Sequence, residues 1–344
     1  MAPQGSKQRS GYSGFGGTKL SAPTPTSYSI GGEELPIFDN RVAFADTLIE
    51  LAKNDDRIVA VCNDSVGSSN LGGFRELFPD RLINVGIAEQ NMVGVGAGLA
   101  NAGMVPFVCA AGPFLSGRAT EQIKADVAYS NVPVILCAMS PGMAYGELGP
   151  THHSVEDFSW MRALPNLDIM SPADEPQLVS AIHWAVEARR PTYLRVGRHK
   201  VPNLSPADFK IERGKSLELR AGDVATVIAT GSMVSRAMAA AEILALEGIN
   251  VQVLSLPFIA PLDVAAISQA ATRAKVIVTV EEANIAGGLG AAVSSVVAAM
   301  PGQTARVLQL GTNDWSPTLS TERLFDHFGL TAQNIAEQIR STIS

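Results

Sequence analysis

Hydrophobic positions alternate between two periods from Arg41 onward. Residues 41–54, RVAFADTLIELAKN, carry apolar side chains on one helical face, and residues 57–64, RIVAVCND, form an apolar run that ends in polar residues. This alternation returns several times along the chain. It predicts an α/β protein in which mostly parallel sheets are flanked by helices. Further predicted strands are 103–110, 132–139, 167–172 and 191–197, and further predicted helices are 121–130 and 175–188.

The pattern is interrupted by prolines and charges at residues 199–216, after which apolar runs at 223–231, 249–256 and 275–282 begin a second α/β unit. Residues 1–36 are rich in Gly, Ser, Thr and Pro and cannot bury enough apolar surface to offset the entropy of ordering. Their lack of early acids faintly resembles an organelle transit peptide, but a plain disordered extension fits better. The predicted organisation is a disordered tail at 1–36, a first domain at 37–205 and a second domain at 206–344.

Composition narrows the class of protein. A chain of 344 residues with 46% hydrophobic content can fill about two ordinary cores. The net charge of −7 is spread along the chain without a basic, aromatic-interleaved cluster, so we expect no nucleic-acid partner. No apolar run reaches the roughly 20 residues of a bilayer span, so we expect no membrane association. Three cysteines without a CxxC pair favour a reducing, cytoplasmic setting over disulfides or zinc.

One carboxylate, Glu89, lies in the otherwise small and apolar segment INVGIAEQNMVGVGAGLANAG, residues 83–103. Its glycines, Gly94, Gly96 and Gly98, follow a predicted helix start, so we expect close helix packing and not a dinucleotide-binding turn. Taken alone, Glu89 has two interpretations. It either complements the helix dipole from the first turn or shares a proton with a bound base.

The motifs around Glu89 resemble, in order, those of the pyrimidine-binding domain of transketolase. They are NVGIAEQNMVGVGAGLANAGMVPF, FLSGRATEQIKADVAYSNVPV, GELGPTHHSVEDFSWMRALPNLDIMSPAD and PTYLRVGRHKVPNL. Later segments, ATGSMVSRAMAAAEIL, INVQVLSLPFIAPLD and EEANIAGGLGAAV, resemble the transketolase C-terminal domain. The resemblance implies transfer of a two-carbon ketol unit from a ketose, or ketose phosphate, to an aldose acceptor, with thiamine diphosphate as cofactor.

A missing motif implies a second chain. Enzymes of this kind hold the diphosphate and Mg²⁺ with a separate domain that carries a GDG motif followed by an NN pair, and this sequence contains no GDG. The resemblance is therefore to the C-terminal subunit of a split transketolase. It implies an N-terminal partner subunit with the GDG and NN motifs, an α2β2 heterotetramer, and no metal ligand in this chain.

The resemblance also implies roles for residues at the cofactor and the reacting atoms. Glu89 matches the glutamate that hydrogen-bonds the pyrimidine N1′, and Phe114 matches the aromatic that stacks on the pyrimidine. Ala111 stands where a second aromatic is common, so the pocket is expected to be looser there. Asp64 matches an acid near the cofactor, although a turn role at a strand end fits it about as well. His152, in GPTHH, matches the histidine that faces the substrate and transfers protons or holds its oxygens.

For a substrate phosphate, the matching positions are Arg41, Ser68 and Arg198, since guanidinium groups pair well with phosphate oxygens. Two positions depart from the family. Ser140 stands where the family has a phosphate-binding histidine. Leu148 replaces an acid that hydrogen-bonds a sugar hydroxyl. The identity of the substrate sugar therefore stays open.

Three other interpretations compete with this one. The β subunit of a 2-oxoacid dehydrogenase has the same two domains, but GPTHHSVEDF argues against it. Deoxyxylulose-phosphate synthase shares the histidine loop but normally carries all domains in one chain. A noncatalytic, regulatory subunit would need neither Glu89 nor His152. Ala283 replaces a histidine frequent in the family, so we expect the C-terminal domain to be structural and interface-forming.

Overall fold

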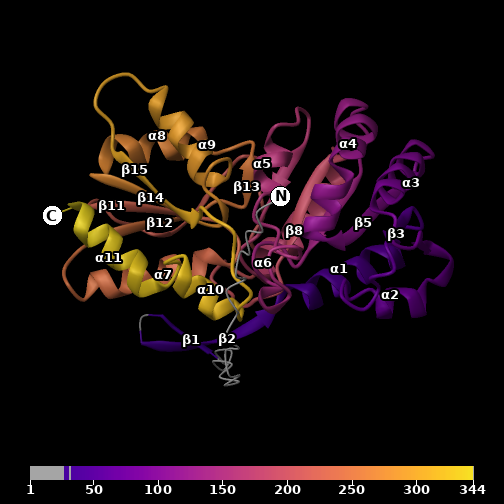
Figure 1. Ribbon diagram of the computed structural model, residues 1–344, viewed down its shortest axis with the longest axis horizontal. Coiled ribbons are helices and arrows are strands. Elements are labelled where there is room, and N and C mark those ends of the chain that lie inside the picture. The colour runs from indigo at the N-terminus through magenta and orange to yellow at the C-terminus, as the bar shows by residue number, and fades with distance from the viewer. Residues whose placement is uncertain (1–26, 31, 344) are drawn as a thin grey trace, which may run out of the picture.

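The computed structural model describes residues 27–30 and 32–343 as two α/β units and a small third sheet (Figure 1). The first unit has a seven-stranded sheet whose neighbouring strands are parallel except at one edge. Its central strands are fully buried, because helices cover both faces. In sheet order the strands are β13 (Phe258–Ala260), β7 (Asp168–Met170), β8 (Thr192–Val196), β6 (Ile135–Met139), β5 (Val105–Ala111), β3 (Ile58–Cys62) and β4 (Leu82–Asn84).

Capping acids start two of the helices on this sheet. Asp39 and Asp174 each accept a hydrogen bond from a backbone N–H in the first turn of α1 (Asn40–Asn54) and α6 (Glu175–Ala188). These two helices pack into one hydrophobic cluster with the sheet, whereas α3 (Glu89–Asn101) belongs to a second cluster. The other helical segments are α2 (Gly72–Leu77), η1 (Pro79–Arg81), η2 (Phe114–Arg118), α4 (Ala119–Gln122), η3 (Ile123–Tyr129), η4 (Gly146–Leu148) and α5 (Asp157–Arg162).

Close packing of α3 on the sheet depends on one of its three glycines. A Cβ added at Gly96 would lie 2.5 Å from Cγ2 of Val108, so any larger residue would push α3 away from β5. At Gly94 an added Cβ would meet Asp126 at an ordinary 3.7 Å, and at Gly98 it would meet open space. The prediction of close packing is confirmed at Gly96, while the other two glycines have no such requirement.

The second unit has a five-stranded sheet that is parallel except for its edge strand β10 (Leu217–Arg220), which runs antiparallel to β12 (Val251–Ser255). Both units therefore have the mostly parallel α/β architecture that the sequence predicts. The remaining strands and helices are β11 (Ala225–Ala229), α7 (Met233–Ala245), α8 (Val264–Arg273), β14 (Val276–Asn284), α9 (Leu289–Ala298), β15 (Arg306–Thr312), α10 (Thr321–His327) and α11 (Ala332–Ile343).

Part of the predicted tail at 1–36 is ordered β-structure. Strand β1 (Ser27–Ile30) runs antiparallel to β2 (Glu33–Asp39), which in turn pairs with β9 (Lys200–Pro202) below the two units (Figure 1). The prediction of disorder is therefore wrong for the described residues of this segment. These strands are partly exposed and contain charges, so they lack the apolar run that marks a buried strand. Residues 1–26 lie outside the described part of the chain.

The two units share a core across the predicted boundary at residue 205. Strand β13 comes from the second predicted domain but pairs with β7 of the first sheet. Ile169 and Ile259 on these strands belong to one buried cluster that also contains Leu254 and Leu289 of the second unit. Contacts between the units are therefore part of the fold.

A buried ion pair lies at this junction. Nε of Arg195 on β8 donates to Oδ2 of Asp157 on α5 at 2.9 Å, and the hydroxyl of Tyr193 donates to the same oxygen at 2.8 Å. The Arg195 guanidinium also donates to the carbonyl oxygens of Ser154 and Glu282, at 3.1 and 3.3 Å. Both charged side chains are almost fully buried, at 5% and 0% exposure. The pair therefore connects the first sheet, α5 and the second unit.

The change Asp157→Asn should lower the free energy of unfolding by about 3–5 kcal/mol, because it leaves the buried Arg195 charge without its counter-ion. Urea denaturation of the full-length chain measures this loss. The matched control is Arg57→Ala, which breaks an exposed pair with Asp55 and should leave the midpoint almost unchanged. Equal midpoints for the two variants would contradict a structural role for the buried pair.

Candidate active site

Glu89 is the first residue of α3, and its carboxylate is buried among polar partners. The side chain is 4% exposed, and Nδ2 of Asn63 donates to Oε1 at 2.7 Å. Nη1 of Arg118 lies 3.0 Å from the same oxygen. The helix has no side-chain cap, so Glu89 also complements its positive end. An apolar sequence segment thus presents one carboxylate, which Asn63, after β3, and Arg118, at the end of η2, hold in place.

Aromatic contacts extend from this carboxylate toward a loop. Phe114 begins the π-helical segment η2, separated by two residues from the end of β5, and the Arg118 guanidinium lies over its ring, 4.0 Å from the centroid. The ring of His152 meets Phe114 edge-on, with 5.2 Å between centroids, and the ring of Tyr145 also meets His152 edge-on, at 6.2 Å. The structure therefore brings together Glu89, Phe114 and His152, three residues that the sequence singles out separately.

The two adjacent histidines of the loop have different environments. His152 is half-buried, with Nδ1 3.0 Å from Oγ1 of Thr151. His153 is buried, and its Nε2 lies 3.1 Å from the carbonyl oxygen of Gly146. Burial lowers the pKa of His153, so this ring is neutral and donates to that carbonyl. His153 supports the loop, while His152 is available to a ligand.

A cavity of about 610 Å³ opens beside the loop, between the two units. Its wall contains three of the predicted substrate residues, Arg41, Leu148 and Arg198. Nη2 of Arg41 pairs with Asp39 at 2.7 Å, and the guanidinium of Arg198 lies 5.2 Å from the ring centroid of Tyr145. Leu148 is 55% exposed. Tyr145 lines the cavity and also contacts His152, so it connects the cavity with the aromatic contacts.

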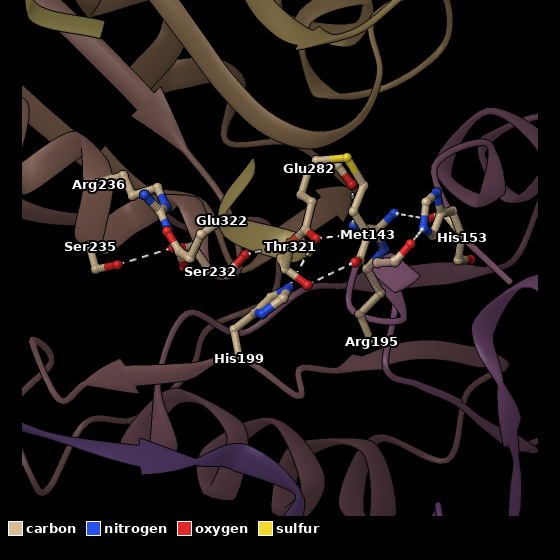
Figure 2. Close-up of polar contacts among 12 residues, drawn as sticks. Met143, His153, Arg195, His199, Ser232, Ser235, Arg236, Glu282, Thr321 and Glu322 are labelled. Atoms are coloured by element: carbon tan, nitrogen blue, oxygen red, sulfur yellow. Dashed lines mark hydrogen bonds and ion pairs between the residues drawn. The ribbon is translucent and has the colours of Figure 1, made fainter. Parts of the chain in front are cut away.

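The second unit supplies the opposite part of the wall. Nη2 of Arg236 donates to both carboxylate oxygens of Glu322 at 2.9 Å, and Ser232 lies nearby (Figure 2). Basic side chains outnumber acidic ones around the cavity, which favours an anionic ligand. The basic residues of the wall are Arg41, Arg198, His199, Lys200 and Arg236, and the acidic ones are Asp39, Glu147 and Glu322.

Glu89, Phe114 and His152 lie beside this cavity but do not line it, and neither do three other predicted residues. Asp64 is exposed and follows β3 after Asn63, Ser68 is half-buried, and Ser140 is fully buried, with no partner for its Oγ among the described residues. Asp64 and Ser140 have left-handed backbones, with φ of 73° and 53°. Such backbones in residues other than glycine typically cost about 1–3 kcal/mol. These two residues follow β3 and β6, the strands on either side of β5 in the first sheet.

Sequence reasoning missed Asn63, Arg118 and Tyr145. Each was close to a predicted residue: Asn63 directly precedes Asp64, and Arg118 and Tyr145 lie within or beside motifs already quoted. No local pattern showed that their side chains converge.

Some functional classes gain no support from the described residues. Within residues 27–30 and 32–343, no group of three or more His, Cys, Asp or Glu could hold a metal ion. No helix in that part of the chain is long and apolar enough to cross a bilayer. The cysteines Cys62, Cys109 and Cys137 are buried thiols, and the cytoplasmic location stays a prediction.

Comparison with known proteins extends these observations. Residues 38–203 match the family described as "Transketolase, pyrimidine binding domain", and residues 214–335 match "Transketolase, C-terminal domain". An apulose-4-phosphate transketolase subunit of Phocaeicola vulgatus is 40% identical over 299 residues, which cover 86% of this chain and 95% of that protein. The 6-deoxy-6-sulfo-D-fructose transketolase subunit of Clostridium sp. is 36% identical over 298 residues, with 86% and 91% covered.

Solved structures agree with this assignment. One described as "Split gene transketolase, inactive beta4 tetramer" has a TM-score of 0.80 and 32% identity, and the match covers 89% of this chain and 98% of that one. Transketolase from Campylobacter jejuni, at 22% identity and a TM-score of 0.77, supports the fold alone, and 47% of that longer chain is covered. The chain therefore belongs to the transketolase family and is the C-terminal subunit of a split transketolase.

Proposed function

We propose that this subunit, together with a partner that binds the diphosphate and Mg²⁺, transfers a two-carbon ketol unit from a ketose to an aldose acceptor. The active assembly is an α2β2 heterotetramer. The observation that carries the proposal is the convergence of Glu89, Phe114 and His152 beside a cavity rich in basic groups. The sequence lacks a GDG motif, so the diphosphate site comes from the partner.

The residues fit the pyrimidine end of thiamine diphosphate. That ring needs a carboxyl partner for N1′ and an aromatic contact for its face, and Glu89 and the half-buried Phe114 offer these. Arg118 contacts both side chains, so they border the same space. When bound, the cofactor supplies the carbanion chemistry of ketol transfer. Glu89 holds a proton at N1′, and His152, on the loop, moves protons at the substrate oxygens.

The cavity suits a ketose with a terminal anion. Arg198 can contact phosphate or sulfonate oxygens from one side of the wall, whereas Arg41 pairs with Asp39 through Nε and Nη2 and keeps Nη1 for an anion. Leu148 cannot accept the hydrogen bond that an acid at this position would take from a sugar hydroxyl. The names of the two relatives above combine an unusual sugar with a phosphate or a sulfo group. A substrate other than the common pentose phosphates is therefore favoured.

The isolated chain should bind thiamine diphosphate weakly and show no transferase activity, because its own sequence has no diphosphate and metal motif. Calorimetry with Mg²⁺, together with a ketol-transfer assay, measures both properties. The positive control is the same preparation after its partner subunit has been added. Tight Mg²⁺-dependent binding by the chain alone would reject the two-chain arrangement.

The change Glu89→Gln should lower kcat by about 10²–10⁴-fold while the complex still assembles, because an amide can contact N1′ but cannot share its proton. NMR of the exchange of the cofactor C2 proton isolates this step from substrate binding. Glu76→Gln, an exposed change on α2, is the control and should exchange normally. Wild-type exchange in Glu89→Gln would remove Glu89 from the mechanism.

The change Leu148→Asp should raise kcat/KM for xylulose 5-phosphate with ribose 5-phosphate, because the new carboxylate accepts from the sugar hydroxyl. A contact of this kind is worth about 1–3 kcal/mol, or about 5- to 150-fold. The assembled enzyme is assayed on this pair and on ketoses that lack or invert the hydroxyl. Leu246→Asp, at a highly exposed site elsewhere, is the control. A wild type that already prefers the common sugars, with no gain in Leu148→Asp, would contradict the role of Leu148.

A further inference from the structure

The loop that carries Leu148 and His152 is closed at its base. Gly142 and Ser154 form an isolated antiparallel bridge, in which Gly142 N–H donates to Ser154 O at 3.0 Å and Ser154 N–H donates to Gly142 O at 2.7 Å. The residues between them project from this base toward the cavity and toward Phe114. Whatever holds the base therefore decides where Leu148 and His152 lie relative to a substrate.

One carboxylate of the second unit holds the base. The backbone N–H of Met143 donates to Oε1 of Glu282 on β14 at 2.6 Å, and Oγ of Ser232 donates to Oε2 at 2.7 Å. Nε2 of His199 lies 3.1 Å from Oε1 (Figure 2). Burial opposes the charge of Glu282, but His199 and the other donors keep the pKa of this carboxyl below its ordinary value. His199 directly follows Arg198, so the same carboxylate holds two parts of the cavity wall.

Packing at the loop base allows little adjustment. Gly142 has φ of 64°, and a Cβ at this position would overlap the carboxyl group of Glu282. The side chain of Met143 is fully buried in a hydrophobic cluster of the second unit, and Oγ1 of Thr321 donates to its carbonyl oxygen at 3.3 Å. A Cβ at Gly146 would lie 2.6 Å from the carbonyl oxygen of Leu319. The second unit therefore contacts the loop along much of its length.

The neighbouring carboxylate has a different role. Glu281 accepts hydrogen bonds from the backbone N–H groups of Leu289 and Gly290, at 2.6 and 2.7 Å, and so caps α9. Successive side chains of a strand point to opposite faces. Glu281 therefore contacts α9 of its own unit, while Glu282 faces the loop. The pair EE in this strand thus combines a structural residue with one that reaches the candidate active site.

We propose that Glu282 is a positioning residue for ketol transfer: it fixes the loop through Met143 and the Arg198 segment through His199. This rests on the proposed function above. Glu282 touches no reacting atom and acts only through the groups it holds. The elements that carry Glu89 and Phe114 make no hydrogen bond to it. Its loss should therefore impair substrate turnover while proton exchange at the cofactor continues.

The test uses the full-length chain, alone and assembled with its partner, in three variants. Glu282→Ala removes every contact of the carboxylate and keeps the backbone carbonyl that accepts from Arg195. Glu282→Gln is the conservative variant, because its amide oxygen can accept from Met143 and His199 while its NH₂ group donates to Ser232. Glu242→Ala is the control, since Glu242 is a carboxylate of the same unit that pairs with Arg220 and not with the loop.

In Glu282→Ala we expect faster deuterium uptake in peptides covering residues 143–154 of the free chain, measured by mass spectrometry. In the complex, kcat/KM should fall by about 10–100-fold, since small misplacements of substrate-positioning groups have effects of this size. Exchange of the cofactor C2 proton should be unchanged. Glu282→Gln should recover most of the loss, and Glu242→Ala should resemble wild type throughout.

Full activity of Glu282→Ala in an active wild-type background would overturn the positioning role alone. A fall in C2 exchange equal to the fall in kcat/KM, with uptake raised throughout the chain, would also overturn it, because that pattern indicates general damage to the fold. An inactive wild-type complex would instead reject the proposed function, and the role of Glu282 in ketol transfer would be rejected with it.

Discussion

The buried guanidinium of Arg195 is the interaction on which the geometry of the site depends. It pairs with Asp157 and donates to the carbonyl oxygens of Ser154, at the loop base, and Glu282, in the second unit. A charge removed from water costs several kcal/mol unless its partners remain in place. These groups are therefore fixed relative to one another. The first sheet, the histidine loop and the second unit meet at one polar junction, and each constrains the other two.

The two units on either side of this junction contribute different parts of the candidate site. Glu89 and Phe114 lie on elements of the first unit alone, whereas the cavity beside them has walls from both. The expectation that the C-terminal domain is structural and interface-forming came from Ala283, which is buried and does not line the cavity. Its neighbour Glu282 faces the opposite way and reaches the loop. The structural and interface-forming role of this domain stays a prediction, and the proposed role of Glu282 adds the positioning of the loop to it.

The sequence predicts the parts of the fold that depend on local pattern. The helix predicted at 175–188 coincides with α6, and the apolar runs became buried strands. Strands β1, β2 and β13 were not predicted, because short or partly exposed edge strands have no continuous apolar run. At the site, the motifs identified Glu89, Phe114 and His152. The partners Asn63 and Glu282 were not predicted. Asn63 contacts a residue 26 positions away and Glu282 one 139 positions away, and no local spacing encodes contacts at such separations.

The position of Leu148 adds an electrostatic argument to the question of specificity. An exposed leucine is ordinary on a protein surface, but this one lies in a wall with five basic and three acidic residues. An acid at this position would accept a hydrogen bond from a hydroxyl, and it would also add a fourth negative charge to that wall. A leucine therefore removes one hydrogen-bond acceptor and leaves the cavity more favourable to an anion. Under the proposed ketol transfer, both effects act in the same direction, because they favour recognition of the charged end of the substrate over the pattern of sugar hydroxyls.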